Sequence, residues 1–168
     1  RTPTTGFLFR EMPVDLNLRK EALDIFKPSI EEVVNIKKGA DLILHSGEVI
    51  SNSELTYPPW KRRSYAYISD TIYTEKIVEH IKNVNLLYHE ATFENKDADL
   101  AKQTFHSTSG QAAQIASEAN AGKLLIGHFS SRYKSTDKML EDAREIFPNT
   151  EAVEDGDIYS VERERGSH

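Results

Sequence analysis

The sequence contains no cysteine among its 168 residues. Disulfide bonds and thiolate zinc sites are therefore excluded, and such a composition fits a cytoplasmic protein. No apolar run approaches the roughly 20 residues that a helix needs to cross a membrane. No signal peptide is recognisable in the first residues, so we expect a cytoplasmic protein that has no membrane partner.

Basic residues are fewer than acidic ones. Lysine and arginine total 21 against 27 acidic residues, which gives a net charge of -6 and a pI near 5.5. A protein with this balance does not coat nucleic acid through bulk charge, so any such contact requires a local basic cluster. The 38% hydrophobic and 29% charged residues are ordinary for a globular domain with a real core, or for part of a larger one.

The first third of the chain is mixed, charged and broken by turns. Apolar residues at near-helical spacing predict a helix over 17–26. Ser29 with Glu32 three residues later is a capping box, which predicts the start of a second short helix. Ser46-Gly47 between two short apolar runs predicts a small hairpin. We interpret residues 12–58 as an inserted arm outside the main fold.

From Arg63 onward, predicted strands alternate with predicted helices. This alternation is typical of an α/β protein with a layered sheet. The expected strands span 6–9, 63–69, 85–88, 123–127, 151–153 and 158–161, and the expected helices span about 74–82, 95–103, 110–121 and 137–147.

Three of these strands end on residues that can do chemistry, namely Asp70, His89-Glu90 and His128. Sites in α/β sheets form outside the carboxyl ends of the strands, so these side chains could converge on a metal ion. The alternative is structural, because an aspartate after a strand often caps a helix or forms a turn. A single histidine there is often a buried structural group. Spacing alone leaves both interpretations open.

Two further stretches have a functional and a structural interpretation. His106 precedes an alanine-rich helix, where it could lie near a phosphate at the helix N-terminus, or simply in a loop beside capping hydroxyls. The basic run 61–63 follows Pro58-Pro59-Trp60 and could grip a nucleic-acid backbone, or could form a solvated turn.

An ordered set of motifs resembles the ribonuclease Z (tRNase Z) family, the endonucleases that trim the 3′ end of precursor tRNA. The motifs are YISDT, LLYHEATF, FHSTSGQAA, GHFSSRY and REIFPNTEAVEDG, and the resemblance covers about residues 1–161. It implies the metallo-β-lactamase-like αββα sandwich, an α/β fold of which this chain is roughly the C-terminal half with an inserted arm.

The resemblance also implies a metal centre and catalytic groups. Asp70 matches the aspartate that bridges two zinc ions, and His128 matches a terminal ligand. Glu90 and His106 match the pair that helps proton transfer to the leaving oxygen. A zinc cofactor of two ions in the complete enzyme is therefore expected.

The expected substrate is precursor tRNA. Lys61 and Arg63 match a loop that contacts the CCA-accepting end, and Thr108 and Arg132 are further expected substrate contacts. The arm corresponds to the family's tRNA-gripping arm, although Lys27-Pro28-Ser29 replaces its usual glycine-proline signature. A homodimer is also implied.

The family's main zinc signature, His-x-His-x-Asp-His, is absent from the sequence. A further histidine ligand is expected one residue before Arg1, so we expect a missing N-terminal segment as a partner. Residues 162–168 are interpreted as a tail, with 165–168 as a tag remnant. Two alternatives remain, namely another phosphodiesterase of this fold and a non-catalytic half-chain that binds tRNA or a partner.

Overall fold

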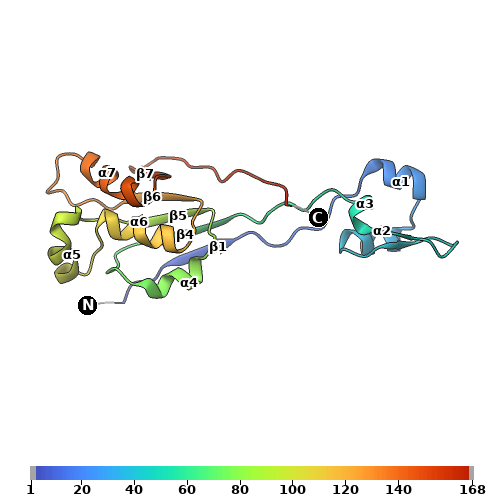
Figure 1. The fold of residues 1–168 in the computed structure, drawn as a ribbon, viewed down its shortest axis with the longest axis horizontal. Coiled ribbons are helices and arrows are strands. Elements are labelled where there is room, and N and C mark those ends of the chain that lie inside the picture. Colours follow the sequence, from blue (N-terminus) through green and yellow to red (C-terminus); the bar gives the residue numbers. More distant parts are fainter. Residues whose placement is uncertain (1–2, 167–168) are drawn as a thin grey trace. The chain divides into compact units, whose positions relative to one another are not determined.

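The computed structural model describes residues 3–166, which divide into two compact units (Figure 1). The sheet unit comprises the residues up to Glu11 together with Arg63–Val161. The arm unit comprises Met12–Arg62 together with the residues from Glu162 onward. Each unit has its own hydrophobic core.

The sheet unit is built on five strands in the order β1-β4-β5-β6-β7. β1 pairs antiparallel with β4, and the remaining neighbours are parallel. The strands are β1 (Phe7–Arg10), β4 (Ser64–Ile68), β5 (Leu86–Glu90), β6 (Lys123–Gly127) and β7 (Thr150–Ala152). The carboxyl ends of β4, β5 and β6 therefore lie at one edge of the sheet.

Helices follow the parallel strands, as the sequence predicts for crossover connections. They are α4 (Val78–Ile81), α5 (Ala98–Thr104), α6 (Ser109–Glu118) and α7 (Asp137–Ile146), with 3-10 turns η1 (Glu75–Ile77) and η2 (Asn95–Asp97). α6 begins with a capping box between Thr108 and Gln111. Its alanines allow close packing, so that Ala112 and Ala116 are completely buried against the sheet and α7.

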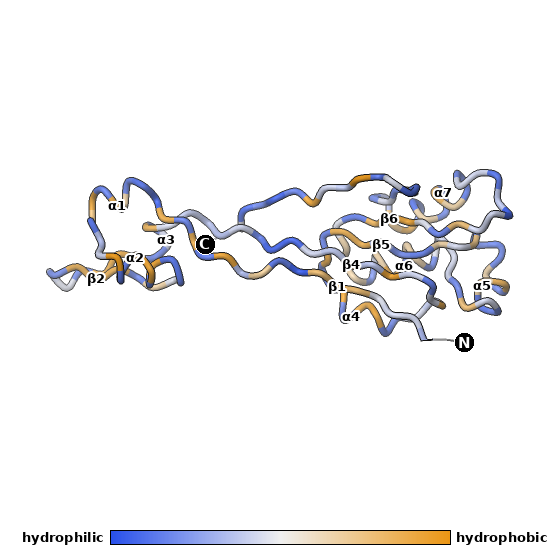
Figure 2. Tube along the Cα trace, turned by 180° about the vertical axis from the view of Figure 1, so that it is seen from behind, coloured by the Kyte–Doolittle hydropathy of each residue, from blue (hydrophilic) through white to orange (hydrophobic). Residues whose placement is uncertain are grey.

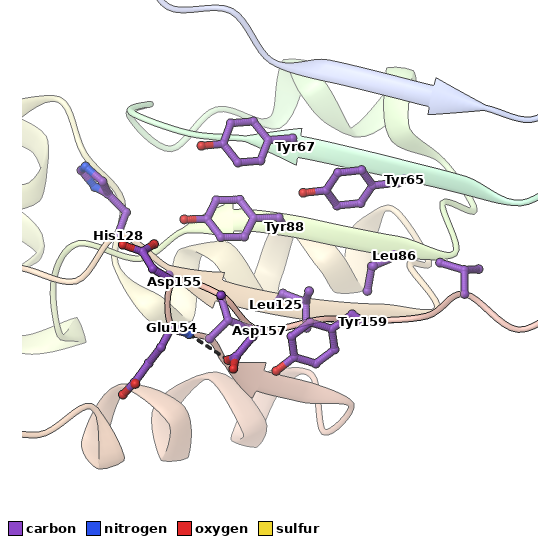
Figure 3. A pocket seen from close by; sticks show the side chains of 14 residues that line it. Tyr65, Tyr67, Leu86, Tyr88, Leu125, His128, Glu154, Asp155, Asp157 and Tyr159 are labelled. Carbon is purple, nitrogen blue, oxygen red and sulfur yellow. Dashed lines mark hydrogen bonds between the residues drawn. The ribbon is translucent and has the colours of Figure 1, made fainter.

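Helices cover one face of the sheet, and the opposite face has no helix over it in the described part of the chain. Ala66, Leu87 and Leu124 are fully buried on the face that the helices cover. Because side chains alternate along a strand, Tyr65, Tyr67 and Tyr88 project from the opposite face, away from the helices (Figure 3). There the rings of Tyr67 and Tyr88 stack at 4.8 Å, and no helix of the described residues covers them.

The arm unit has a small core of its own. Its elements are α1 (Lys20–Phe26), α2 (Ile30–Lys37), β2 (Leu42–Ile43), β3 (Val49–Ile50) and α3 (Asn52–Leu55). The predicted capping box of Ser29 and Glu32 is confirmed, with both reciprocal hydrogen bonds present. The predicted hairpin is confirmed as well, and Gly47 adopts φ 87° in its turn, a conformation that favours glycine.

Two sequence predictions on secondary structure need correction, and one helix was not predicted. Residues 158–161 do not form a strand, because Ile158 is 92% exposed and finds no sheet edge among the described residues. The predicted helix over 74–82 is a 3-10 turn followed by a single α-turn. The short helix α3 was not predicted.

The end of the described chain packs within the arm unit. The backbone N–H of Lys61 donates to the carbonyl of Glu164, and that of Gly166 donates to Pro59. The Arg165 guanidinium lies 4.3 Å from the centroid of the Trp60 ring. The tag-remnant interpretation of 165–168 stays a prediction, and its last two residues lie outside the described part. No helix in the described part is long and apolar enough to span a membrane.

Figure 2 shows how hydropathy follows this architecture. Hydrophobic stretches coincide with strands of the sheet unit, and hydrophilic stretches dominate the connecting loops. The residues with polar chemistry that the sequence singles out therefore lie where apolar strands give way to loops. The candidate site lies at the edge of the sheet where β4, β5 and β6 end.

Candidate metal centre and catalytic groups

Asp70 and His128 are turned out of the sheet by the backbone. Asp70 follows β4 and His128 directly follows β6, and their φ values are 52° and 63°. Both lie in the left-handed region, which non-glycine residues seldom adopt and which occurs often at functional sites. Asp70 caps no helix, because the next element, η1, is capped by Thr74. The metal interpretation of Asp70 therefore fits better than the capping one.

The two side chains meet at the edge of the sheet. His128 Nε2 lies 3.1 Å from Asp70 Oδ1, and the two side chains are 42% and 48% exposed. His106 joins them, so that one ligand atom from each of the three lies within 4.8 Å of the others. Carboxylate oxygens and imidazole nitrogens are donors that zinc accepts. These three residues could hold a metal ion, so the donor set fits one.

Glu90 lies behind the three residues and is completely buried. Its Oε1 accepts from the Thr71 N–H at 2.9 Å and lies 2.8 Å from His106 Nδ1. Its Oε2 accepts from the Thr92 N–H at 3.1 Å. The resemblance implies Glu90 and His106 as a pair, and the structure brings these two together. The contact occupies Nδ1 of His106 and leaves Nε2 available.

Thr92 is a residue that the sequence analysis missed. Its hydroxyl oxygen lies 2.6 Å from Glu90 Oε2, 2.9 Å from His128 Nδ1 and 3.2 Å from His106 Nδ1. The signal in the sequence was its position two residues after Glu90, within the same motif. Two residues apart on an extended chain share a side, which is why both reach the same imidazoles.

His89 lies in the core and not in the site. It is completely buried, and burial lowers the pKa of its imidazole. Nδ1 lies 2.7 Å from the Glu90 carbonyl oxygen, while Nε2 has no hydrogen-bond partner in the described part of the chain. The expectation that His89 joins the cluster at the strand ends is therefore wrong. The neighbours His89 and Glu90 point to opposite faces of the sheet.

Arg132 lies near the cluster because it contacts the ring of Phe93, which in turn contacts His106. Its guanidinium lies 5.1 Å from the Phe93 ring centroid, and Phe93 contacts His106 edge-on at 6.2 Å. Its Nε donates to Ser130 Oγ. Thr108, by contrast, is 2% exposed, and its hydroxyl accepts from the Gln111 N–H as a helix cap. Of the two expected substrate contacts, Arg132 is thus the one with an accessible side chain.

Lys61 and Arg63 both have acidic partners. Lys61 Nζ lies 2.9 Å from Glu164 in the arm unit. Arg63 donates from Nε and Nη2 to the Glu11 carboxylate at 3.0 and 2.6 Å, and from Nη1 to the Val161 carbonyl. Arg63 precedes β4 and Asp70 follows it, so at about 3.3 Å per residue their seven-residue separation spans roughly 23 Å of extended chain. Arg63 therefore does not share the metal site.

The fold of the chain is that of the metallo-β-lactamases. The structure of the metallo-β-lactamase fold protein YhfI from Bacillus subtilis superposes with a TM-score of 0.55 at 24% identity, over 58% of this chain and 40% of that one. The predicted fold class is therefore confirmed. No family model matches the sequence.

The chain is more similar in sequence to several curated proteins. The chain is 46% identical to the Ribonuclease Z of Phocaeicola vulgatus over 150 residues, which is 89% of this chain and 48% of that protein. It is 47% identical to that of Bacteroides thetaiotaomicron over the same shares. It is 44% identical to that of Cytophaga hutchinsonii over 171 residues, which is all of this chain and 53% of that protein. The predicted resemblance to ribonuclease Z is confirmed, and the chain spans about half the length of these relatives.

Proposed function

We propose that this chain is part of a zinc-dependent endoribonuclease that hydrolyses a phosphodiester at the 3′ end of precursor tRNA. The observation that carries the proposal is the cluster of Asp70, His106 and His128 around the buried carboxylate of Glu90. Its residues occupy the motifs on which the resemblance to ribonuclease Z rests. A cytoplasmic location and a homodimer belong to the same proposal.

Each residue of the cluster has a distinct role in this proposal. Asp70 and His128 would hold the zinc as ligands. Bound metal would supply Lewis-acid stabilisation of the phosphoryl oxygens and a nucleophilic water. His106 donates a proton from Nε2 to the leaving oxygen, because its Nδ1 is held 2.8 Å from Glu90. Glu90 orients that imidazole from its buried position.

Substrate contacts are the second part of the proposal. Arg132, held over the Phe93 ring beside His106, is suited to a phosphate next to the scissile bond. Lys61 and Arg63 contact the accepting end of tRNA, and residues 12–58 grip its body. Thr108 acts by fixing the N-terminus of α6 and the loop that carries His106.

The proposed metal site needs further donors, because Asp70 and His128 cannot hold two zinc ions alone. We propose that a segment with the His-x-His-x-Asp-His motif supplies them. The uncovered face of the sheet supports this proposal. A hollow of about 510 Å³ lies there, lined by tyrosines 65, 67 and 88, by His128 and by residues of the segment 153–161 (Figure 3). Burial raises the pKa of Tyr88 to about 12, so its ring meets an added layer uncharged.

The test compares the chain alone with the chain joined to a segment that carries the His-x-His-x-Asp-His motif. End-labelled precursor tRNA should be cleaved near the 3′ end only by the joined form, with zinc bound. Asp70→Ala should abolish cleavage and lower the zinc content, because an anionic ligand of the zinc is lost. Full zinc content and an unchanged rate in that variant would refute the ligand assignment. Cleavage by the chain alone would refute the need for a second segment.

A second candidate is another phosphodiesterase of the same fold. It is favoured by the ion pairs of Lys61 with Glu164 and of Arg63 with Glu11, which occupy the cations expected to meet tRNA. Competition between precursor tRNA and a small model phosphodiester decides between them. A joined enzyme that turns over the small diester and ignores tRNA would establish the second candidate.

A further inference from the structure

The hydroxyl of Thr92 lies where three functional groups meet. Its oxygen lies 2.6 Å from Glu90 Oε2, 2.9 Å from His128 Nδ1 and 3.2 Å from His106 Nδ1, and the residue is 7% exposed. A threonine hydroxyl has a single proton to donate, so it donates to only one of these neighbours. The direction of this hydrogen-bond chain therefore determines which nitrogen of His128 carries a proton.

The surroundings of Glu90 decide the direction. Its two carboxylate oxygens each already accept from a backbone N–H, of Thr71 and of Thr92. The Thr92 hydroxyl donates to Oε2 at 2.6 Å, a shorter contact than the 3.1 Å of the backbone N–H on the same oxygen. Its oxygen is left to accept from His128.

We propose that Thr92 is a positioning residue that fixes the Nδ1–H tautomer of His128 and so presents its Nε2 lone pair for metal binding. Glu90 does the same for His106, because Oε1 lies 2.8 Å from its Nδ1. One buried carboxylate thus orients two imidazoles, one directly and one through the threonine. The two rings lie 5.4 Å apart with 29° between their planes, and Nε2 of His128 lies 3.1 Å from Asp70 Oδ1.

Asp70 is the competing partner of His128. Its Oδ1 lies 3.1 Å from Nε2 and would favour a proton on that nitrogen. Once a cation engages the aspartate, this competition ends and Thr92 alone selects the tautomer. Hydrogen-bonded outer partners of ligand histidines commonly fix tautomer and orientation in this way. The inference rests on the ligand role proposed for His128.

The test observes the tautomer directly by ¹⁵N NMR of the 168-residue chain with labelled histidine, at a pH where His128 is neutral. Asp70→Ala serves as the background, because it removes the competing acceptor. In that background Nδ1 of His128 should be protonated and Nε2 should show the shift of an unprotonated nitrogen. Thr92→Val, which keeps the shape and removes the hydroxyl, should lower the ratio of the two tautomers about 3- to 10-fold, as loss of one hydrogen bond predicts.

Thr92→Ser is the matched control and should restore the ratio. Thermal melts of all variants separate a tautomer effect from a general loss of structure. If Thr92→Val does not fold, the spectrum of the Asp70→Ala chain still decides, since a proton on Nε2 there overturns the proposal. An unchanged ratio in a folded Thr92→Val chain overturns it too. None of these measurements uses zinc or tRNA, so a failure of the tautomer assignment is distinguishable from a failure of the proposed function.

Discussion

The sheet unit and the arm unit bury their apolar residues to very different degrees. The core cluster of the sheet unit contains sixteen buried hydrophobic residues, and that of the arm unit contains five. Both units leave large apolar side chains outside, such as Ile30 of the arm unit at 86% and Ile158 of the sheet unit at 92% exposed, so the contrast lies in the size of the two cores. A small core gives a small margin of stability. The unit with the larger core therefore holds the candidate catalytic groups, where sub-ångström geometry matters.

The largest expected effect is on the chemistry of the sheet unit. In the joined enzyme, Glu90→Gln or His106→Ala should lower the cleavage rate roughly 10²–10⁴-fold, the usual contribution of general acid–base catalysis. Zinc content and tRNA affinity should change little. Single-turnover kinetics with metal analysis measure both. A loss of zinc in His106→Ala would instead make His106 a ligand, as its distance to Asp70 and His128 also allows.

The next effect compares the two cores with one matched substitution. Leu87 in the sheet unit and Leu55 in the arm unit are 0% and 1% exposed. Leu87→Ala should reduce the free energy of unfolding of the sheet unit by about 2–5 kcal/mol through the cavity it leaves. Leu55→Ala should unfold the arm locally and leave the sheet protected, as amide hydrogen exchange would show. Equal loss of protection in β5 and β6 from both variants would mean that the units fold as one.

A third prediction concerns pH and the buried imidazole of His89. Burial lowers the pKa of His89 below its ordinary value of 6.5. The unfolded chain therefore binds a proton first as the pH falls, and the folded state does not. This contribution to stability is complete above pH 6.5. Below that pH it decreases by about 1.4 kcal/mol per pH unit until the folded form also titrates.

Chemical denaturation of the chain at several pH values measures this dependence. His89→Leu should flatten the slope between pH 6.5 and 5, because the titrating group is gone. His80→Gln, which removes an exposed histidine of the same unit, is the control and should keep the slope. A slope that persists in His89→Leu would assign the pH dependence to other groups.

The smallest effect is expected from the basic run before β4. Lys61→Gln in the joined enzyme should raise KM for precursor tRNA a few-fold. The slope of the logarithm of tRNA affinity against the logarithm of salt concentration should become shallower by about one, as loss of one phosphate contact predicts. Hydrolysis of a small model phosphodiester should not change. Glu164→Gln is the matched variant. It releases Lys61 from its 2.9 Å ion pair and should lower KM. An increase in KM from both variants would assign the pair a structural role.

Local sequence patterns determined much of this protein. The strand and helix order after Arg63 follows from apolar runs and turn residues. The capping box of Ser29 follows from two side chains three positions apart, because capping depends only on neighbours in the chain. Motifs at strand ends indicated Asp70, Glu90 and His128, since parallel strands deliver such residues to one edge. His106 was indicated by its position before the alanine-rich helix.

Tertiary structure decided what the patterns left open. Whether His89 or Glu90 faces the site depends on which face of β5 the helices cover, because adjacent residues of a strand point in opposite directions. The acidic partners of Arg63 and Lys61 lie 52 and 103 positions away in the sequence. Thr92 acquired its place between Glu90 and His128 only when β5 and β6 paired. The local sequence pattern determines the helices and strands. Contacts between distant residues exist only after packing has brought those residues within hydrogen-bond distance.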